Sequence, residues 1–319
     1  MHTLVHDDIT TAADRIAGHV RPVALAAPTE PGGVHLALEL MQYTGSFKAR
    51  GAQNFLLAHR EAGTLPDAGV TIASGGNAGL ACAWAAARQG VPATVFLPAT
   101  APRVKVARLR EYGADVRLVG TEYAEALGAC EEFALATGAL ASHAYDHPLI
   151  AAGAGTLLDE IRRQVPGLDT VVVSVGGGGL FAGVATAARH HGIRTVAVEP
   201  ENCRALDAAV RAGRPVDVTV DSVAADSLGA RRASATAVWA AQKDGVESVL
   251  VPDAAIVRAR QTLWDDRRLA VEHAAATALA AVARPGADTP DSAYRPAPGE
   301  TVCVVLCGAN TDPTDLVAP

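Results

Sequence analysis

Residues 170–190 read TVVVSVGGGGLFAGVATAARH, and this stretch decides the fold class. An apolar, β-branched run leads into four consecutive glycines, and an alanine-rich segment follows them. The first part is typical of a buried strand, and the last part is typical of a helix that packs on a sheet. Residues 171–188 carry no charge, but the central glycines favour strand, loop and helix over a membrane-spanning helix.

The same order of strand, turn and helix recurs along the chain. The other predicted strands cover residues 70–74, 93–97, 115–119, 195–198, 248–251 and 301–306. The predicted helices cover residues 78–89, 102–112, 122–136, 254–264 and 272–283, with a further one from about residue 180. Repeated βα units build parallel sheets that are covered on both faces, so we predict an open, doubly wound α/β protein. Residues 284–299 are rich in Pro, Gly, Asp and Ser, which predicts an exposed loop.

The composition and net charge exclude several classes of function. A chain of 319 residues with 50% hydrophobic and 19% charged residues can form two compact lobes and is not disordered. The net charge of -7 gives no basic face, so neither nucleic acid nor an anionic membrane is an expected partner. Five cysteines without a C-x-x-C pair predict reduced thiols, and the N-terminus lacks a signal-peptide pattern. We therefore expect a cytoplasmic protein.

The glycine run at Gly176, Gly177, Gly178 and Gly179 is the first candidate binding site. Bare backbone N–H groups ahead of a helix N-terminus suit an anion, above all a phosphate. No Gly-Lys-Ser/Thr follows the run, and the spacing is not that of a dinucleotide fingerprint, which favours a small phosphate ester. The alternative interpretation is a flexible turn.

Three further segments contain groups that can do chemistry. Lys48 lies beside Phe47 in an apolar patch, where lost solvation would ease its deprotonation and let it attack a carbonyl, although it could equally be a solvated surface lysine. The turn at residues 74–79 could bind a carboxylate or could simply cap a helix. Cys307 could be a core thiol or could contact a ligand at the sheet edge.

Taken together, these segments resemble the fold-type II pyridoxal-phosphate enzymes, which include serine and threonine dehydratases and serine racemase. The similarity runs from about Leu38 to Thr311. It rests on Gln-x-Thr-Gly-Ser-Phe-Lys-x-Arg-Gly-Ala at 42–52, Ser-Gly-Gly-Asn-Ala-Gly at 74–79, the glycines at 176–179, Val-Glu-Pro at 198–200 and Cys-Gly-x-Asn at 307–310. The resemblance implies a two-lobed, tryptophan synthase β-like architecture. The small α/β lobe would span residues 43–147, and residues 1–42 plus 148–319 would form the large cofactor-binding lobe.

The resemblance also implies roles for individual residues. Lys48 would hold pyridoxal 5′-phosphate as a Schiff base and move the substrate Cα proton. Phe47 would lie against the pyridine ring, Asn77 would hydrogen-bond its 3′-oxygen, and Cys307 would face its nitrogen. Gly176, Gly177, Gly178 and Gly179 would bind the phosphate. The substrate carboxylate would be bound by Ser74, Gly75, Gly76 and Asn77.

The implied reaction is the elimination of water and ammonia from L-serine or L-threonine to give a 2-oxo acid, in a homodimer. Racemases of the family have a serine where this chain has Gly75, so racemisation is not expected. Ala205 replaces an acid of the divalent-metal pattern, which leaves open only a monovalent cation at Glu199. The alternatives are another hydroxy-amino acid, as in hydroxyaspartate dehydratases, a β-replacement reaction, or a catalytically silent binding homologue.

Overall fold

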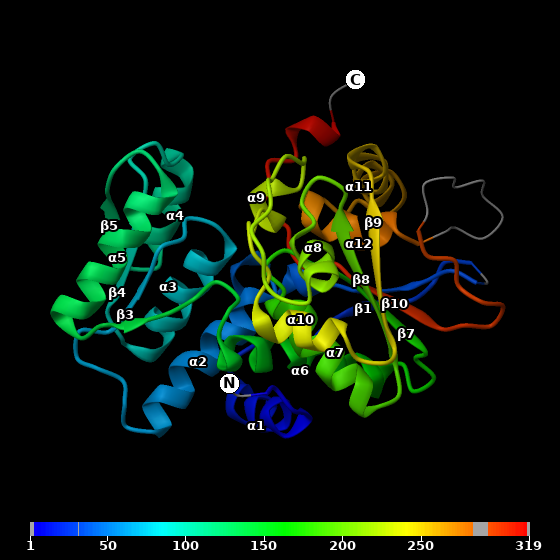
Figure 1. The fold of residues 1–319 in the computed structure, drawn as a ribbon, viewed down its shortest axis with the longest axis horizontal. Coiled ribbons are helices and arrows are strands. Elements are labelled where there is room, and N and C mark those ends of the chain that lie inside the picture. Colours follow the sequence, from blue (N-terminus) through cyan, green and yellow to red (C-terminus); the bar gives the residue numbers. More distant parts are fainter. Residues whose placement is uncertain (1–2, 31, 283–292, 318–319) are drawn as a thin grey trace.

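The computed structural model describes residues 3–30, 32–282 and 293–317, and the structural statements below refer to these residues. It contains two open sheets, each covered by helices (Figure 1). The larger sheet has the strand order β1 (Leu25–Ala26), β2 (His35–Ala37), β10 (Val302–Val305), β7 (Thr170–Ser174), β8 (Arg194–Pro200) and β9 (Val246–Val251). The smaller sheet has the order β5 (Asp115–Leu118), β4 (Ala93–Leu97), β3 (Val70–Ile72) and β6 (Leu140–Ala141).

The helices divide between the two sheets. The smaller sheet, on the left of Figure 1, carries α3 (Asn77–Gln89), α4 (Arg103–Glu111) and α5 (Tyr123–Thr137). Helix α2 (Lys48–Glu61) packs on both α3 and α6 and so lies between the two parts of the molecule. With the larger sheet are α1 (His6–Ile16), α6 (Pro148–Gln164), α7 (Gly179–His190), α8 (Ala205–Ala212), α9 (Ala225–Leu228), α10 (Ala235–Ala241), α11 (Asp253–Arg267) and α12 (His273–Ala280).

The predicted α/β architecture with parallel sheets is confirmed, and all neighbouring strands run parallel except β1 and β2. The last predicted helix, residues 272–283, is shorter in the structure, because α12 ends at Ala280. Of the predicted loop at 284–299, residues 284–292 lie outside the described residues. The described remainder is not exposed throughout, since Tyr294 is buried and forms a bridge with Val282.

Each sheet has a point at which the strand order reverses. In the larger sheet the chain passes from β7 to β8 on one side, whereas β10 pairs with the other side of β7. In the smaller sheet β3 likewise lies between β4 and β6. Ligands of open α/β sheets bind beyond the carboxyl ends of the strands at such reversals. The loops after β7, β10, β3 and β6 are therefore expected to form the ligand site.

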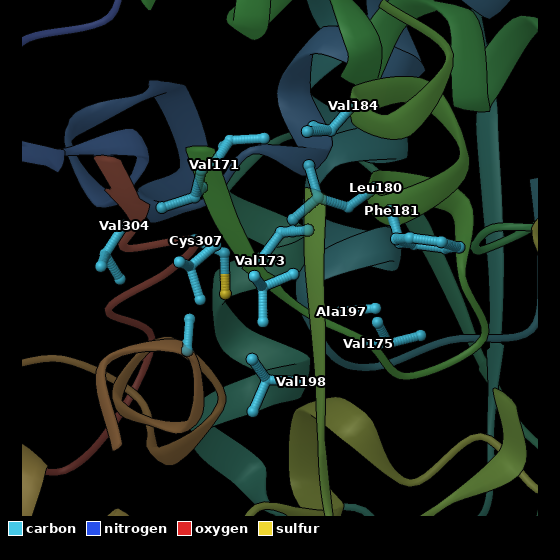
Figure 2. Packing of buried hydrophobic residues seen from close by; sticks show 14 of the residues in the cluster. Val171, Val173, Val175, Leu180, Phe181, Val184, Ala197, Val198, Val304 and Cys307 are labelled. Carbon is cyan, nitrogen blue, oxygen red and sulfur yellow. The ribbon is translucent and has the colours of Figure 1, made fainter. Parts of the chain in front are cut away.

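The core of the larger sheet holds the first of these loops in place. Val171 and Val173 of β7, Phe181 of α7 and Val198 of β8 are fully buried and belong to one hydrophobic cluster (Figure 2). Helix α7 also packs tightly on α6, since a Cβ at Gly183 would lie 2.6 Å from the Gly155 nitrogen. The segment 171–188 is thus a strand, a loop and a helix, as predicted, and none of the described helices could span a bilayer.

Candidate functional site

The segment that carries Lys48 is fixed by backbone pairing to the loop after β10. Ser46 and Gly308 form an antiparallel bridge, and the Phe47 N–H donates to the Cys307 carbonyl at 3.0 Å. The Ala309 N–H in turn donates to the Gly45 carbonyl at 2.9 Å. Lys48 therefore begins α2 directly beside the carboxyl end of β10, although more than 250 residues separate the two segments.

A buried ion-pair network anchors the first turn of α2. The Arg50 side chain is fully buried, and its guanidinium donates to Glu39 at 2.7 and 2.9 Å and to Glu160 at 2.7 Å. Glu160 lies on α6, so the network ties α2 to the helices of the larger sheet. An unpaired buried charge is strongly unfavourable, so the three side chains hold one another in place and α2 with them.

The Lys48 amine lies between the two sheet edges. Its Nζ donates to the carbonyl of Ala144, in the loop after β6, at 2.7 Å. Burial lowers the pKa of Lys48 to about 8, although negative charge on Cys307 or Glu272 would oppose this shift. Lys48 and Phe47 line a small cavity together with Ala144 and Gly179. The amine and the glycine run, more than 120 residues apart in sequence, thus share one cavity.

The four glycines form the turn between β7 and α7. Gly178 has a φ of +94° and precedes the first residue of the helix. A Cβ at Gly177 would overlap the Tyr145 ring, one at Gly178 would overlap Ala237, and one at Gly179 would lie 2.8 Å from the Tyr145 carbonyl. No side chain fits at these three positions, so the turn presents bare backbone at the helix N-terminus, which suits a phosphate.

A polar network that the sequence did not predict joins the two sheets at this edge. The Glu272 carboxylate, at the start of α12, accepts hydrogen bonds from the Asn77 side chain at 2.9 Å and from the Ser227 hydroxyl at 2.6 Å. It also accepts one from the Asn310 N–H at 2.8 Å. The Asn310 side chain donates to the Asn77 side-chain oxygen at 2.7 Å and to the Thr44 carbonyl at 2.6 Å. Asn77 of α3 is therefore bound by Glu272, which precedes α12, and by Asn310, which follows β10.

The turn of Ser74, Gly75 and Gly76 connects β3 to α3 and so lies beside Asn77. A Cβ at Gly75 would meet the Leu97 side chain at 2.7 Å. Among the described residues, nothing comes within 4 Å of a Cβ at Gly76. This turn thus has room for a side chain at Gly76, whereas the glycine run has none at Gly177 or Gly178.

Cys307 lies at the end of β10 with its Sγ 3.6 Å from the Ser174 Oγ of β7. Burial raises the pKa of Cys307 to about 12, and Glu272 adds to this effect. The thiol is therefore neutral at physiological pH. All five cysteines are buried and unpaired, in agreement with the predicted reduced thiols.

Two hydroxyls near Lys48 are buried without a hydrogen-bond partner among the described residues, those of Thr44 and Ser46. Buried polar groups usually have partners, so these hydroxyls indicate that a polar ligand completes the site. Thr44 also has a φ of 65°, an unfavourable conformation for a β-branched residue that is found mostly at functional sites. The buried amine with its lowered pKa, the bare glycine turn and the neutral thiol fit a phosphorylated aldehyde cofactor.

Glu199 lies near the carboxyl end of β8. Its carboxylate accepts from the N–H groups of Leu206 and Asp207 at 2.7 and 2.8 Å and so caps the start of α8. Burial raises the pKa of Glu199 to about 8 despite these two hydrogen bonds. A monovalent cation at Glu199 stays a prediction.

The fold and the site were compared with known proteins. The family model of pyridoxal-phosphate dependent enzymes matches residues 20–308. The L-threonine ammonia-lyase of Geobacter sulfurreducens is 35% identical over 95% of this chain and 75% of that protein. The serine dehydratase-like protein of Rattus norvegicus is 37% identical over 87% of this chain and 85% of that protein. The structure of maize serine racemase superposes with a TM-score of 0.87, at 28% identity over 99% of this chain and 96% of that one. This chain belongs to the family of pyridoxal-phosphate dependent enzymes.

Proposed function

We propose that this protein is a pyridoxal-phosphate-dependent ammonia-lyase that removes water and ammonia from L-serine or L-threonine and releases a 2-oxo acid. The observation that carries the proposal is the cavity shared by Lys48 and Gly179, which puts a desolvated amine beside a bare glycine turn. The names of the two relatives at 35 and 37% identity support the same reaction class.

The cofactor would be held at three points. Lys48 would hold it covalently through Nζ, and the backbone of Gly176, Gly177, Gly178 and Gly179 would bind its phosphate at the start of α7. Cys307 would face the ring nitrogen with a thiol that stays protonated, because its pKa is about 12. When bound, pyridoxal phosphate supplies an electron sink for the charge that develops at the substrate Cα.

The protein's own groups would then handle the substrate. The Lys48 amine, oriented by the Ala144 carbonyl, would take the proton from the substrate Cα. Because its pKa is about 8, about a tenth of this amine is neutral at pH 7, which is about 300 times the share for an unperturbed lysine. The backbone of Ser74, Gly75 and Gly76 and the start of α3 would bind the substrate carboxylate. The Phe47 ring would lie against the cofactor, and Asn77 would hydrogen-bond it.

The similarity to a racemase raises a second candidate reaction. Racemisation needs a group that returns a proton to the opposite face of the substrate Cα. Gly75 has no side chain for this purpose, and this favours elimination. We further infer from the unpaired cysteines that the enzyme is cytoplasmic, and the family resemblance implies a homodimer. Light scattering on the purified protein would measure twice the chain mass of 32.6 kDa for such a dimer.

The decisive experiment compares Lys48→Ala with the wild type. Oxo-acid release would be measured for L-serine, L-threonine and 3-hydroxyaspartate, and chiral chromatography would follow the remaining substrate. We expect Lys48→Ala to lower turnover by at least about a thousandfold. Borohydride treatment followed by peptide mass spectrometry would find the cofactor on Lys48 in the wild type. Lys105→Ala is the matched control, because Lys105 pairs with Asp226 at the surface.

Three results would contradict the proposal. A Lys48→Ala variant with wild-type turnover would remove the residue from the reaction. A wild type that releases no oxo acid but racemises its substrate would favour the second candidate reaction. A wild type that carries the cofactor on Lys48 but turns over none of the substrates would indicate a silent homologue.

A further inference from the structure

Three histidines and an aspartate meet where α1, α6 and α7 come together, at the lower edge of the molecule in Figure 1. His6 is the first residue of α1, His190 is the last residue of α7, and His191 follows it. One ring nitrogen from each imidazole lies within 4.8 Å of the other two. Asp159 of α6 joins them, with its Oδ1 2.7 Å from His191 Nε2 and its Oδ2 3.1 Å from His6 Nε2.

These distances are close to those of a metal-ligand shell. Four ligands about 2.0–2.1 Å from a tetrahedral zinc ion lie about 3.3 Å from one another. The two distances from Asp159 already approximate this spacing, and the nitrogens need to approach one another by about 1.5 Å at most. His6 and His191 are only partly exposed and share Asp159, so they form the ordered part of the set.

His190 has to move for all three rings to bind one ion. Its ring stacks on that of His6, with centroids 3.9 Å apart and planes 3° from parallel. A metal lies in the plane of each imidazole that binds it, so two stacked rings cannot share one ion. His190 is exposed, and rotation of its side chain out of the stack disturbs no packed neighbour in the core.

The charges around the cluster favour a cation. Asp159 supplies a carboxylate, and the last carbonyls of α7 add the negative end of the helix dipole beside His190 and His191. Three imidazoles with one carboxylate suit borderline divalent ions such as Zn²⁺ rather than Mg²⁺ or Ca²⁺.

We propose that His6, His190, His191 and Asp159 bind one divalent transition-metal ion of the zinc type. All four ligands come from the protein, so the site is structural and not catalytic. It would join the start of α1 to α6 and to the carboxyl end of α7. The glycine run is at the opposite end of α7, about 18 Å away for a helix of 12 residues. The ion would therefore stabilise the fold without taking part in the reaction.

Titration calorimetry with Zn²⁺ on the untagged, chelator-treated holoenzyme tests the proposal. We expect one ion per chain and a Tm that rises by about 2–5 °C at saturating Zn²⁺. His6→Ala and His191→Ala should each weaken binding by at least about tenfold. His19→Ala is the matched control, because His19 follows the other end of α1 and should leave the affinity unchanged. Co²⁺ in place of Zn²⁺ should give the strong visible bands of a tetrahedral site.

The proposal is wrong if the wild type shows no stoichiometric Zn²⁺ binding, or if His6→Ala and His191→Ala bind Zn²⁺ as the wild type does. Circular dichroism of each variant would verify that it folds. Turnover of the folded variants should equal that of the wild type in either case. The test is therefore independent of the lyase reaction, and either proposal can fail alone.

Discussion

The two glycine-rich turns of the site differ in how much freedom their surroundings leave them. The turn at Gly176–Gly179 is enclosed, because side chains at Gly177 and Gly178 would overlap Tyr145 and Ala237. The turn at Ser74–Gly76 is open, because a Cβ at Gly76 would meet nothing described and one at Gly75 would meet only the end of the Leu97 side chain. The first turn therefore accepts no side chain at Gly177 or Gly178. The second can be altered at Gly76 without disturbing the core.

This difference corresponds to two functions that we propose for the site, which are binding the cofactor and binding the substrate. An enclosed backbone turn holds its anion with little loss of entropy and fixes the position of everything attached to it. A turn with spare room at one position can admit another side chain there. We therefore expect substitutions in the first turn to affect cofactor binding, and substitutions in the second to affect the substrate and the product.

Lys48 shares a cavity with Gly179 of the enclosed turn, and its titration gives the largest expected effect. With a pKa of about 8 instead of 10.5, its neutral fraction at pH 7 is about 300 times larger. Because only the neutral amine attacks the cofactor aldehyde, the rate at which apoenzyme takes up pyridoxal phosphate should rise with pH up to about 8 and then level off. Stopped-flow absorbance measures this rate, with Nα-acetyl-lysine as the reference amine. A rate that keeps rising to pH 10 would show that the site leaves Lys48 unperturbed.

The second prediction compares one alanine substitution in each turn. Gly178→Ala places a Cβ against Ala237 at a φ of +94° and should weaken cofactor binding on the order of 10- to 100-fold. Gly76→Ala, at a φ of -94° in open space, should change the cofactor affinity less than about twofold. Fluorescence titration of the apoenzymes measures both affinities. Equal effects in the two variants would show that the contrast between the turns has no functional meaning.

The third prediction concerns Gly75→Ser, with a smaller expected effect than that of Gly178→Ala. The new Cβ displaces the flexible end of Leu97 at a cost of about 1 kcal/mol, so elimination should slow less than about tenfold. The added hydroxyl should also allow some proton return to the substrate Cα, which chiral chromatography detects as D-isomer. Gly76→Ser controls for the added hydroxyl alone. Unchanged stereochemistry in Gly75→Ser would count against a role for this position.

Much of the fold could be predicted from sequence because its signals are local. The strands at residues 93–97 and 170–174 match the prediction, since short β-branched runs between turn residues have few other interpretations. Helix α6 was not predicted, and its Gly153 and Gly155 explain why. Glycine disfavours helix in isolation, but here it allows the close approach of α2 and α7.

The site could be predicted only in part, because some of its contacts join residues without a local sequence signal. Lys48, the glycines and Cys307 lie in distinctive motifs, and the structure brings them to one edge. The network of Asn77, Glu272 and Asn310 joins residues that are far apart in sequence. In the sequence, Glu272 is notable because Glu-His at 272–273 stands where the family that this chain resembles has Glu-Pro. No local pattern tells which distant amides its carboxylate will meet.

The bridge between Ser46 and Gly308 has a consequence for synthesis of the chain. A ribosome makes Lys48 early, but the strand pairing that positions it must wait for residues that follow some 260 positions later. At about 5–20 residues per second, that wait lasts on the order of ten to fifty seconds. Until then the Lys48 amine lacks the burial that lowers its pKa in the folded protein. The completed cofactor site can therefore form only after Gly308 has left the ribosome exit tunnel.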